Sequence, residues 1–538
     1  MSATKPTKYI FVLGGVMSGL GKGITASSIG YLLKQAGVKV TILKLDPYLN
    51  VDPGTMNPYQ HGEVFVLDDG SETDLDLGHY ERFIDVNMTK NNNATAGQIY
   101  STVLDRERKG EYLGDTVQVI PHITDEIIKR IKAVNNPKKY DVVICEVGGT
   151  VGDIESLPFM EAIRQLSLEV GYHNHMLVHV TLLPYVKASG ELKSKPTQHS
   201  VMKLREIGLA PDMIFCRSEH PIEQSVRDKI ALFCNVRSDH VIEGLDVPTI
   251  YEVPLMMHEQ NAGELINDRL NIEKKPSLKD LRKFIHNFKN PSHEVTIAMC
   301  GKYTELIDSY KSVMEAFIHA GVENNARVNV KWVQTENIKD DKSAKKAFKD
   351  IDGILLLPGF GSRGSEGKIH SSKYARENKI PFLGICLGLQ CAVIDFARNV
   401  CGMKGANSTE FDKNTNFPVI DLMESQRAIK IKGGTMRLGA YDCEIKTGTK
   451  TYAAYRKKKI SERHRHRYEV NNRYRKKLEK NGLVFSGMNE DLGVVETIEI
   501  PDHPWFVSGQ FHPELKSRVN KAHPLFREFI KAGVKNKI

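Results

Sequence analysis

Cys386 lies in a short stretch whose residue types and spacing suit a nucleophile. It follows the apolar run 381–385, with Gly384 before it and Gly388 after it. Flanking glycines permit the tight turn that pushes a side chain out of the end of a strand, and the start of a following helix favours a thiolate. A cysteine at the end of a strand can also be buried and inert. The motif alone therefore leaves a nucleophile and a structural cysteine open.

A general base and a carboxylate that could serve this thiol occur much later in the chain. His512 and Glu514 follow the short apolar run 505–508. His512 could remove the thiol proton and return it to a leaving group, while Glu514 would fix the tautomer of the imidazole. A surface turn is the alternative for this short sequence on its own. The loop 357–361 ends another apolar run and offers backbone N–H groups for an oxyanion hole. Together these features predict a Cys-His-Glu triad for acyl transfer.

A glycine-rich loop near the N-terminus has the composition of a phosphate cradle. The apolar run 9–13 leads into the loop 14–23, and a plausible helix covers 24–34. Glycines let backbone N–H groups converge on phosphate oxygens, the helix N-terminus adds its positive end, and Lys22 supplies a full charge. The spacing before Lys22 is one residue longer than in a standard P-loop, and Gly23 replaces the usual Ser or Thr metal ligand. A glycine turn without a ligand is the alternative.

Two acidic positions could replace the missing metal ligand. Glu146 follows the apolar run 140–145, and ligands of open α/β sheets bind at the carboxyl ends of strands. The stretch 72–79, which includes Asp76, is a second source of carboxylates, although a solvated acidic loop would explain it equally well. Carboxylates that share a site with phosphates are typical magnesium ligands. We therefore expect a magnesium and nucleotide site if these residues meet.

Two further polar stretches suit anionic ligands. The stretch 193–199 carries Lys193 and Lys195, which suit a triphosphate as point charges, although by itself it is only a polar loop. The stretch 462–472 is rich in arginine and histidine and, taken alone, looks like an RNA-binding patch. However, the net charge of +9 is spread over 538 residues that include 66 acidic ones. We expect small anionic ligands and no nucleic-acid partner.

The elements that must position these residues follow an α/β pattern, because apolar β-branched runs alternate with glycine turns and helical stretches. The candidate strands form two groups: 9–13, 38–43, 140–145 and 176–183, then 295–300, 353–357, 381–385 and 505–510. The polar stretch between the groups could hold one amphipathic helix through Leu278, Leu281, Ile285 and Phe288. We predict a first domain at 1–266, a linker at 267–293 and a second domain at 294–538.

Composition places the chain among ordinary globular proteins, with 41% hydrophobic and 26% charged residues. The eight cysteines contain no C-x-x-C pair, so neither a zinc site nor a disulfide framework is indicated. The polar start and the short apolar run after it make neither a signal peptide nor a membrane span. We expect a cytoplasmic protein with no membrane partner.

Taken together, these motifs resemble the glutamine-dependent CTP synthase family. In the first half the resemblance rests on 14–23, 44–48, 61–66, 74–83 and 146–156, and in the second half on the Cys386 turn, the loop 357–361, the His512 motif and 462–472. It implies a dethiobiotin-synthetase-like P-loop domain joined to a class I, triad-type glutamine amidotransferase domain. The implied activity is that of a ligase that aminates UTP to CTP through a 4-phosphorylated UTP, with ATP and glutamine-derived ammonia, in the last step of de novo CTP synthesis.

The resemblance also assigns residues. Magnesium would be held by Asp76 and Glu146, and the triad would be Cys386, His512 and Glu514. The residues implied for ATP are Gly19, Leu20, Gly21, Lys22, Gly23, Ile24, Asp76, Leu245, Asp246 and Val247. Those implied for UTP or the product CTP are Ser18, Asp153, Ile154, Glu155, Lys193, Ser194, Lys195, Pro196, Thr197, Gln198 and Lys229. Those implied for glutamine are Gly359, Leu387, Gly388, Leu389, Gln390, Glu410 and Arg467.

Family resemblance further implies activation by GTP, feedback inhibition by CTP and a homotetramer. Two other classes of protein are alternatives to this interpretation. An ATP-dependent amidase such as a cobyrinic acid amide synthase shares both folds, but the stretches 193–198 and 74–83 argue against it. A P-loop switch ATPase that binds partners needs no thiol nucleophile, so the triad argues against that class.

Overall fold

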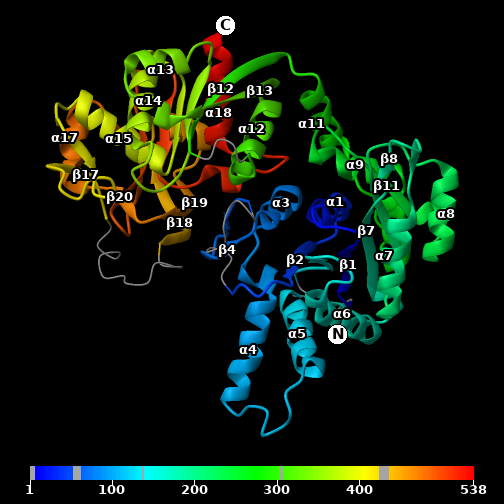
Figure 1. The fold of residues 1–538 in the computed structure, drawn as a ribbon. Helices are drawn as coiled ribbons and strands as arrows, with labels where there is room; N and C mark the ends of the chain where they lie inside the picture. Colours follow the sequence, from blue (N-terminus) through cyan, green and yellow to red (C-terminus); the bar gives the residue numbers. More distant parts are fainter. Residues whose placement is uncertain (1–5, 52–61, 136–138, 303–306, 423–435, 538) are drawn as a thin grey trace. The chain divides into compact units, whose positions relative to one another are not determined.

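The computed structural model describes residues 6–51, 62–135, 139–302, 307–422 and 436–537, and Figure 1 shows the course of the chain. His61, at the start of one of the motifs above, lies outside the described residues. Packing divides the chain into two compact units. The first comprises residues 1–53 and 76–285, and the second comprises 54–75 and 286–538.

The first unit is built on a seven-stranded sheet with the order β11-β10-β7-β1-β6-β2-β5. All of its neighbouring strands run parallel. The strands are β1 (Lys8–Gly14), β2 (Val40–Asp46), β5 (Asn93–Thr95), β6 (Val142–Val147), β7 (His175–Leu182), β10 (Met213–Ser218) and β11 (Val241–Leu245). Their nearly continuous apolar sequences fit a sheet buried on both faces. The predicted α/β class is confirmed.

Helices cover both faces of this sheet. Phe11, Leu45 and Val143 point to one face and share a core with helices α5 and α6, whereas Gly30 of α1 lies against Ile42 and Ile144 on the other face. The helices are α1 (Lys22–Gln35), α3 (Leu75–Ile84), α4 (Ala96–Arg108), α5 (Thr124–Val134), α6 (Leu157–Val170), α7 (Lys195–Glu206), α8 (Gln224–Cys234), α9 (Val253–Glu259), α10 (Ala262–Leu270) and α11 (Lys279–Lys289). The amphipathic helix expected in the linker is confirmed as α11.

The second unit contains a nine-stranded sheet with the order β13-β12-β14-β15-β23-β22-β21-β18-β19. Its first five strands are parallel, and the remaining ones are antiparallel. They are β12 (His293–Gly301), β13 (Ala326–Gln334), β14 (Gly353–Leu356), β15 (Phe382–Ile385), β18 (Arg437–Ile445), β19 (Lys459–His466), β21 (Val484–Asn489), β22 (Val494–Glu499) and β23 (Phe506–Gly509). The parallel strands β12, β14, β15 and β23 were predicted from the sequence, whereas the edge strand β13 and the antiparallel strands were not.

Helices again lie on both faces of the second sheet. Alternate side chains of β12 contribute to two separate cores: Ile297 and Met299 join the core that contains α12 and α18, while Ala298 and Cys300 join the one that contains α14 and α15. The helices are α12 (Lys311–Glu323), α13 (Asp341–Ala347), α14 (Ser365–Glu377), α15 (Leu387–Asn399), α16 (Lys450–Tyr455), α17 (Arg475–Lys480) and α18 (Pro524–Lys537). A small sheet of β16 (Ala406–Ser408), β17 (Phe417–Leu422) and β20 (Tyr468–Val470) completes the unit.

One segment of the first half of the sequence packs with the second unit. It contains the antiparallel hairpin of β3 (Phe65–Val66) and β4 (Glu72–Thr73), and its described part is 62–75. The predicted domain boundaries at 266 and 294 stay a prediction. The hairpin lies in the first half of the sequence but packs in the second unit. In the described part of the chain, no helix is long and apolar enough to cross a membrane.

Candidate active sites

The glycine loop joins β1 to α1, as the sequence predicts. Gly19 and Gly21 adopt φ angles of 75° and 84°, which suit glycine and rarely suit other residues. Lys22 starts the helix, and its Nζ donates a hydrogen bond of 2.7 Å to the carbonyl of Gly149. Burial lowers the pKa of Lys22, although the nearby Glu146 opposes this effect. The loop therefore places a lysine, a helix N-terminus and turned backbone N–H groups together, as phosphate binding requires.

Asp76 explains the unusual glycine at position 23. A Cβ atom built on Gly23 would collide with the carboxylate of Asp76. The side chain of Asp76, from the first turn of α3, therefore occupies the space where a standard P-loop carries its Ser or Thr. A carboxylate oxygen thus replaces the hydroxyl oxygen as the candidate metal ligand next to the phosphate cradle.

A buried lysine holds three carboxylates at the carboxyl ends of β2 and β6. Nζ of Lys44 lies 2.5 Å from Asp76, 2.6 Å from Glu146 and 3.7 Å from Asp46. Burial alone would lower the pKa of Lys44, but Asp76, Glu146 and Asp46 together raise it well above its usual value. The hydroxyl of Tyr80 also donates to Glu146 over 2.6 Å. Lys44 and Asp46 are the charged residues of the buried strand β2, and a charge in such a strand is the sequence signal that could have found this role.

The residues at this position fit a magnesium ion that also binds phosphate. Asp76 and Glu146 contact the same ammonium group, so their oxygens lie close enough to share one cation. The described residues contain no group of three or more His, Cys, Asp or Glu side chains that could hold a metal. Two carboxylates are what magnesium uses when phosphate oxygens and water complete its shell. The assignment of Asp76 and Glu146 to magnesium stays a prediction that this geometry supports.

The residues predicted for the pyrimidine nucleotide lie in several places. Lys193 pairs with Glu191, and Lys229 of α8 also contributes to lowering the pKa of Glu191, so the two lysines lie around one carboxylate. Residues 195–198 form the first turn of α7 rather than a loop. Asp153 accepts a hydrogen bond from the Thr150 backbone. No hydrogen bond or ion pair among the described residues joins Asp153 to either lysine.

The other predicted nucleotide contacts lie around these groups. Ser18 is exposed in the glycine loop, and Ile154 and Glu155 begin a short 3-10 helix after Asp153. The adenine contacts predicted at 245–247 follow β11, where Asp246 pairs with Arg217. All of these positions stay predictions.

The Cys386 turn has the geometry of a nucleophile elbow. Cys386 lies between β15 and α15 with φ 53° and ψ −102°, a backbone conformation that is strained for any residue other than glycine. A Cβ at Gly384 would lie 2.7 Å from Oγ of Ser508, and one at Gly388 would lie 2.6 Å from the carbonyl of Leu356. Both flanking glycines are therefore required by close packing. The thiol stands at the N-terminus of a helix, where a thiolate is favoured.

The predicted base lies beside this thiol. Nδ1 of His512 is 2.7 Å from Glu514, and Nε2 is buried without a hydrogen-bond partner among the described residues. Burial alone would lower the pKa of His512, but Glu514 and then Cys386 raise it to about 10. The three side chains are thus brought together by β15, by the chain after β23 and by a short 3-10 helix that contains Glu514. With this pKa the imidazole is protonated at neutral pH.

The residues predicted for glutamine surround the same thiol. Gly359 follows β14 with φ 159°, and the neighbouring Gly361 donates its backbone N–H to Glu410 over 2.6 Å. Burial raises the pKa of Glu410. The first turn of α15 supplies residues 387–390, and Nε2 of Gln390 donates to the carbonyl of Tyr468 over 3.0 Å. That carbonyl belongs to the residue after Arg467, so the first turn of α15 is hydrogen-bonded to the backbone beside Arg467.

Sequence reasoning missed a buried lysine behind the oxyanion loop. Lys368 of α14 is 1% exposed, and its Nζ donates to the carbonyl of Leu357 over 2.5 Å. Burial lowers the pKa of Lys368 to about 8, and Cys391 and Cys386 lie near enough to oppose that effect. Nothing in the sequence near Lys368 indicates this position, because the other lysine of α14, Lys373, has a similar polar neighbourhood and is half-buried.

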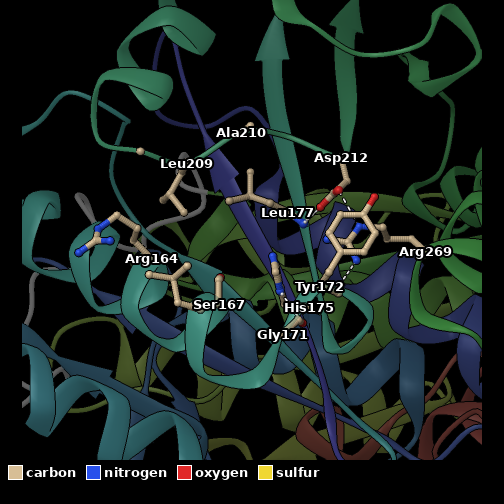
Figure 2. A pocket seen from close by; sticks show the side chains of 12 residues that line it. Arg164, Ser167, Gly171, Tyr172, His175, Leu177, Leu209, Ala210, Asp212 and Arg269 are labelled. Carbon is tan, nitrogen blue, oxygen red and sulfur yellow. Dashed lines mark hydrogen bonds and ion pairs between the residues drawn. The ribbon is translucent and has the colours of Figure 1, made fainter.

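A separate pocket of about 440 Å³ lies in the first unit (Figure 2). It opens at the amino ends of β7 and β10, the edge opposite the glycine loop. Its charged groups Arg269 and Asp212 are paired within the protein: Arg269 pairs with Asp212 over 2.7 Å and lies over the ring of Tyr172, and Asp212 also accepts from the Leu177 backbone. Ligands of open α/β sheets bind at the carboxyl edge, so this pocket is not the nucleotide site.

Comparisons with known proteins bear on both sites. Residues 8–272 match the family model described as CTP synthase N-terminus, and residues 305–532 match that of glutamine amidotransferase class-I. A CTP synthase of Caldanaerobacter subterraneus is 60% identical over 532 residues, which cover 99% of each chain. One from Methanocaldococcus jannaschii is 56% identical over 540 residues, covering 99% of this chain and all of the relative. The chain belongs to the CTP synthase family.

Membership of the CTP synthase family agrees with both sites described above. Members of this family are ligases that use ATP. The first matched region covers most of the first packed unit and also the hairpin that packs with the second unit, and the second matched region lies wholly in the second unit. The solved glutaminase domain of Trypanosoma brucei CTP synthase with bound acivicin is 37% identical and covers 45% of this chain and 94% of its own, with a TM-score of 0.42.

Proposed function

We propose that this protein converts UTP to CTP with ATP, using ammonia that it releases from glutamine. The proposal rests on two features of one chain: a Cys-His-Glu triad, and a P-loop beside which two candidate metal ligands, Asp76 and Glu146, meet at Lys44, with Asp76 against Gly23. The triad supplies ammonia, and the P-loop site activates the carbonyl that ammonia attacks. Family membership over the full length of the relatives supports the same pairing.

In the glutaminase half, Cys386 would attack the side-chain carbonyl of glutamine. The thiolate forms a C–S bond, and the carbonyl oxygen becomes an oxyanion near the backbone N–H groups of Gly359 and Leu387. His512 then donates its proton to the departing nitrogen, which leaves as ammonia, and later activates the water that releases glutamate. Glu514 holds the imidazole through Nδ1, so the catalytic proton is on Nε2. Glu410 and Arg467 would bind the α-amino and α-carboxylate groups of glutamine.

In the synthetase half, the loop 19–24 would hold the ATP phosphates, with Lys22 as a point charge. Magnesium, when bound by Asp76 and Glu146, would neutralise the charge on the β- and γ-phosphates during phosphoryl transfer. Transfer of the γ-phosphoryl group to O4 of UTP turns a poor leaving group into a good one. Ammonia then displaces phosphate and gives CTP, and a proton leaves the attacking nitrogen.

Regulation and assembly extend this proposal. CTP shares the ribose and triphosphate of UTP, so the positions around Lys193 and Lys229 would bind it as a feedback inhibitor. Activation by GTP, assembly into a homotetramer and a cytoplasmic location remain predictions from the family resemblance, and the geometry of the described residues adds no argument for them.

The test is to incubate the protein with UTP, ATP, magnesium and glutamine and to follow nucleotides by chromatography and glutamate by an enzymatic assay. We expect CTP, ADP, phosphate and glutamate in equal amounts, and CTP without glutamate when ammonium replaces glutamine. Reactions without ATP or without UTP are the controls. Glutamine hydrolysis with no CTP under any of these conditions would show that the synthetase assignment is wrong.

A further inference from the structure

The hairpin of β3 and β4 is attached to the strand that lies behind the glutaminase triad. Nε of Arg463 is 2.6 Å from Asp68, and Nε of Arg465 is 2.7 Å from Glu72. The Arg463 side chain is fully buried, and that of Glu72 is 6% exposed. The other two members, Asp68 and Arg465, are 32% and 22% exposed, so each pair joins a buried group to a partly exposed one. Removing the partner of a buried charge is costly, because that charge is left unpaired. The hairpin is therefore fixed to β19 by two successive arginines of one strand face.

Backbone contacts reinforce this attachment. The Ala440 N–H of β18 donates to the carbonyl of Asp68 over 2.9 Å, and a Cβ at Gly439 would lie 2.6 Å from the backbone nitrogen of Gly70. The hairpin turn thus lies directly against the backbone of β18, which is hydrogen-bonded to β19. Burial would raise the pKa of Asp68, but Arg463 and Lys516 lower it, so Asp68 is a carboxylate at neutral pH.

The same two arginines contact the triad through their backbone carbonyls, and the Arg465 guanidinium lies over an aromatic ring of the oxyanion loop. The carbonyl of Arg463 accepts the backbone N–H of His512 over 2.8 Å. The carbonyl of Arg465 lies 4.0 Å from Sγ of Cys386, and the guanidinium of Arg465 lies 5.6 Å from the centre of the Phe360 ring in the oxyanion loop. Each arginine therefore connects one hairpin carboxylate to one part of the triad or its oxyanion loop.

We propose that Asp68 and Glu72 are positioning residues of the glutaminase reaction, which hold β19 in place behind His512 and Cys386. Neither carboxylate touches the thiol or the imidazole. Their effect passes through the backbone carbonyls of Arg463 and Arg465, which fix where the base and the nucleophile stand. A small displacement of a catalytic group lowers the rate of the chemical step more than the affinity for the substrate. The hairpin thus makes residues 65–73, far from the triad in sequence, a working part of the glutaminase site.

The test uses the full-length protein and measures glutamate release as a function of glutamine concentration. In Glu72→Gln, which keeps the shape but removes the charge, we expect kcat to fall about tenfold while KM changes less than about threefold. Asp68→Asn should show a smaller fall, because Lys516 and Arg463 share that carboxylate. The double variant Glu72→Gln with Arg465→Gln should be no slower than Arg465→Gln alone, since both changes break the same pair.

Glu366→Gln is the matched control, because Glu366 forms an ion pair of 2.7 Å with Arg398 in the same unit but away from β19. It should keep kcat within about twofold of the wild type. The melting temperature of each variant is measured as well. If Glu72→Gln unfolds the protein, Asp68→Asn carries the same test.

Three results would overturn the proposal: an unchanged kcat in both hairpin variants, additive losses in the double variant, or an equal loss in Glu366→Gln. Glutamate release is measured without UTP or ATP, so this test does not depend on the synthetase part of the proposed function. If the wild type forms no CTP but the hairpin variants still lower kcat for glutamine, the proposed function fails and the positioning role stands.

Discussion

The two candidate sites differ in how their charged groups are paired. At the glutaminase site the base is already oriented for the reaction: Nδ1 of His512 is bound to Glu514, and the thiol of Cys386 is near enough to help raise the pKa of the imidazole. At the nucleotide site the candidate metal ligands Asp76 and Glu146 are instead bound by Lys44. A magnesium ion would have to compete with this ammonium group. A site for the neutral amide of glutamine can be preformed. A site for ATP and magnesium contains buried carboxylates, and these need a partner such as Lys44 before the ligands bind.

The largest effect that tests this comparison is expected from Cys386→Ala. Glutamate release and glutamine-dependent CTP formation should fall by at least about a thousandfold, because no other thiol replaces the nucleophile. CTP formation from ammonium at alkaline pH should stay near the wild-type rate. The measurement is the ratio of the two rates at saturating ATP and UTP.

Cys391→Ala is the matched control for this variant. Cys391 lies in the same helix, and burial raises the pKa of its thiol to about 12, so it is inert. It should keep glutamine-dependent activity. Loss of the ammonium reaction in a folded Cys386→Ala protein would show that the two sites do not act separately.

The second prediction concerns the nucleotide site. Asp76→Asn should lower CTP formation at least about a hundredfold with either glutamine or ammonium, because it removes a ligand of the metal that stabilises phosphoryl transfer. Glutamate release measured without nucleotides should change little. Magnesium titration of the remaining activity should require higher concentrations. Full activity at limiting magnesium would contradict the metal assignment.

A substitution at Gly23 sharpens this prediction. Gly23→Ser should be strongly impaired, since its Cβ collides with Asp76. Combining it with Asp76→Gly removes the collision and supplies a hydroxyl at the position of a standard P-loop ligand. Partial recovery of ammonium-dependent CTP formation in the double variant is expected. A double variant no better than Gly23→Ser alone would mean that Asp76 does not stand in for the hydroxyl.

The third prediction is a pH dependence of the glutaminase site. Glu514 raises the pKa of His512 to about 10, so His512 stays protonated, and able to donate to the leaving nitrogen, up to that pH. In Glu514→Gln this charge is lost and the pKa falls, so the alkaline decline of glutamate release should begin at lower pH than in the wild type. The measurement is kcat for glutamate release between pH 6 and about 10.5, a range that includes the deprotonation of His512. An unchanged alkaline limb would contradict the assignment of His512 as the proton donor.

The smallest effect is expected from Lys368→Met. This change removes the hydrogen bond to the carbonyl of Leu357 just before the oxyanion loop, and loss of one such bond corresponds to a roughly three- to tenfold decrease in kcat/KM for glutamine. Ammonium-dependent CTP formation should not change. Lys373→Met, in the same helix, is the control and should leave both rates unaffected, since the half-buried Lys373 pairs with the exposed Asp341.

Much of the fold followed from local sequence patterns. All eight predicted strands coincide with observed ones, because strands buried on both faces have apolar runs that need no knowledge of their neighbours. Among the strands that were not predicted, β18 and β19 are rich in charged residues whose partners lie elsewhere in the chain. Arg437, for example, is buried in β18 only because Glu469 and Glu496 surround it.

The sequence by itself determined the motifs whose chemistry depends on adjacent residues. The turn around Cys386 and the glycine loop before Lys22 both require a strand, glycines and a helix in succession. The residues of these three parts are consecutive in the sequence, so the motifs can be recognised there. His512 and Glu514 are two residues apart, so their hydrogen bond is also a local feature.

Only the tertiary structure decided which distant groups meet. It placed Asp76 in the space above Gly23, gathered three carboxylates around Lys44, put Lys368 behind the oxyanion loop and attached the β3–β4 hairpin to β19. The physical reason is that a charged residue has a similar local sequence whether it is solvated or buried. Its role depends on the desolvation and the partner that folding provides, and neither can be read from its neighbours in the chain.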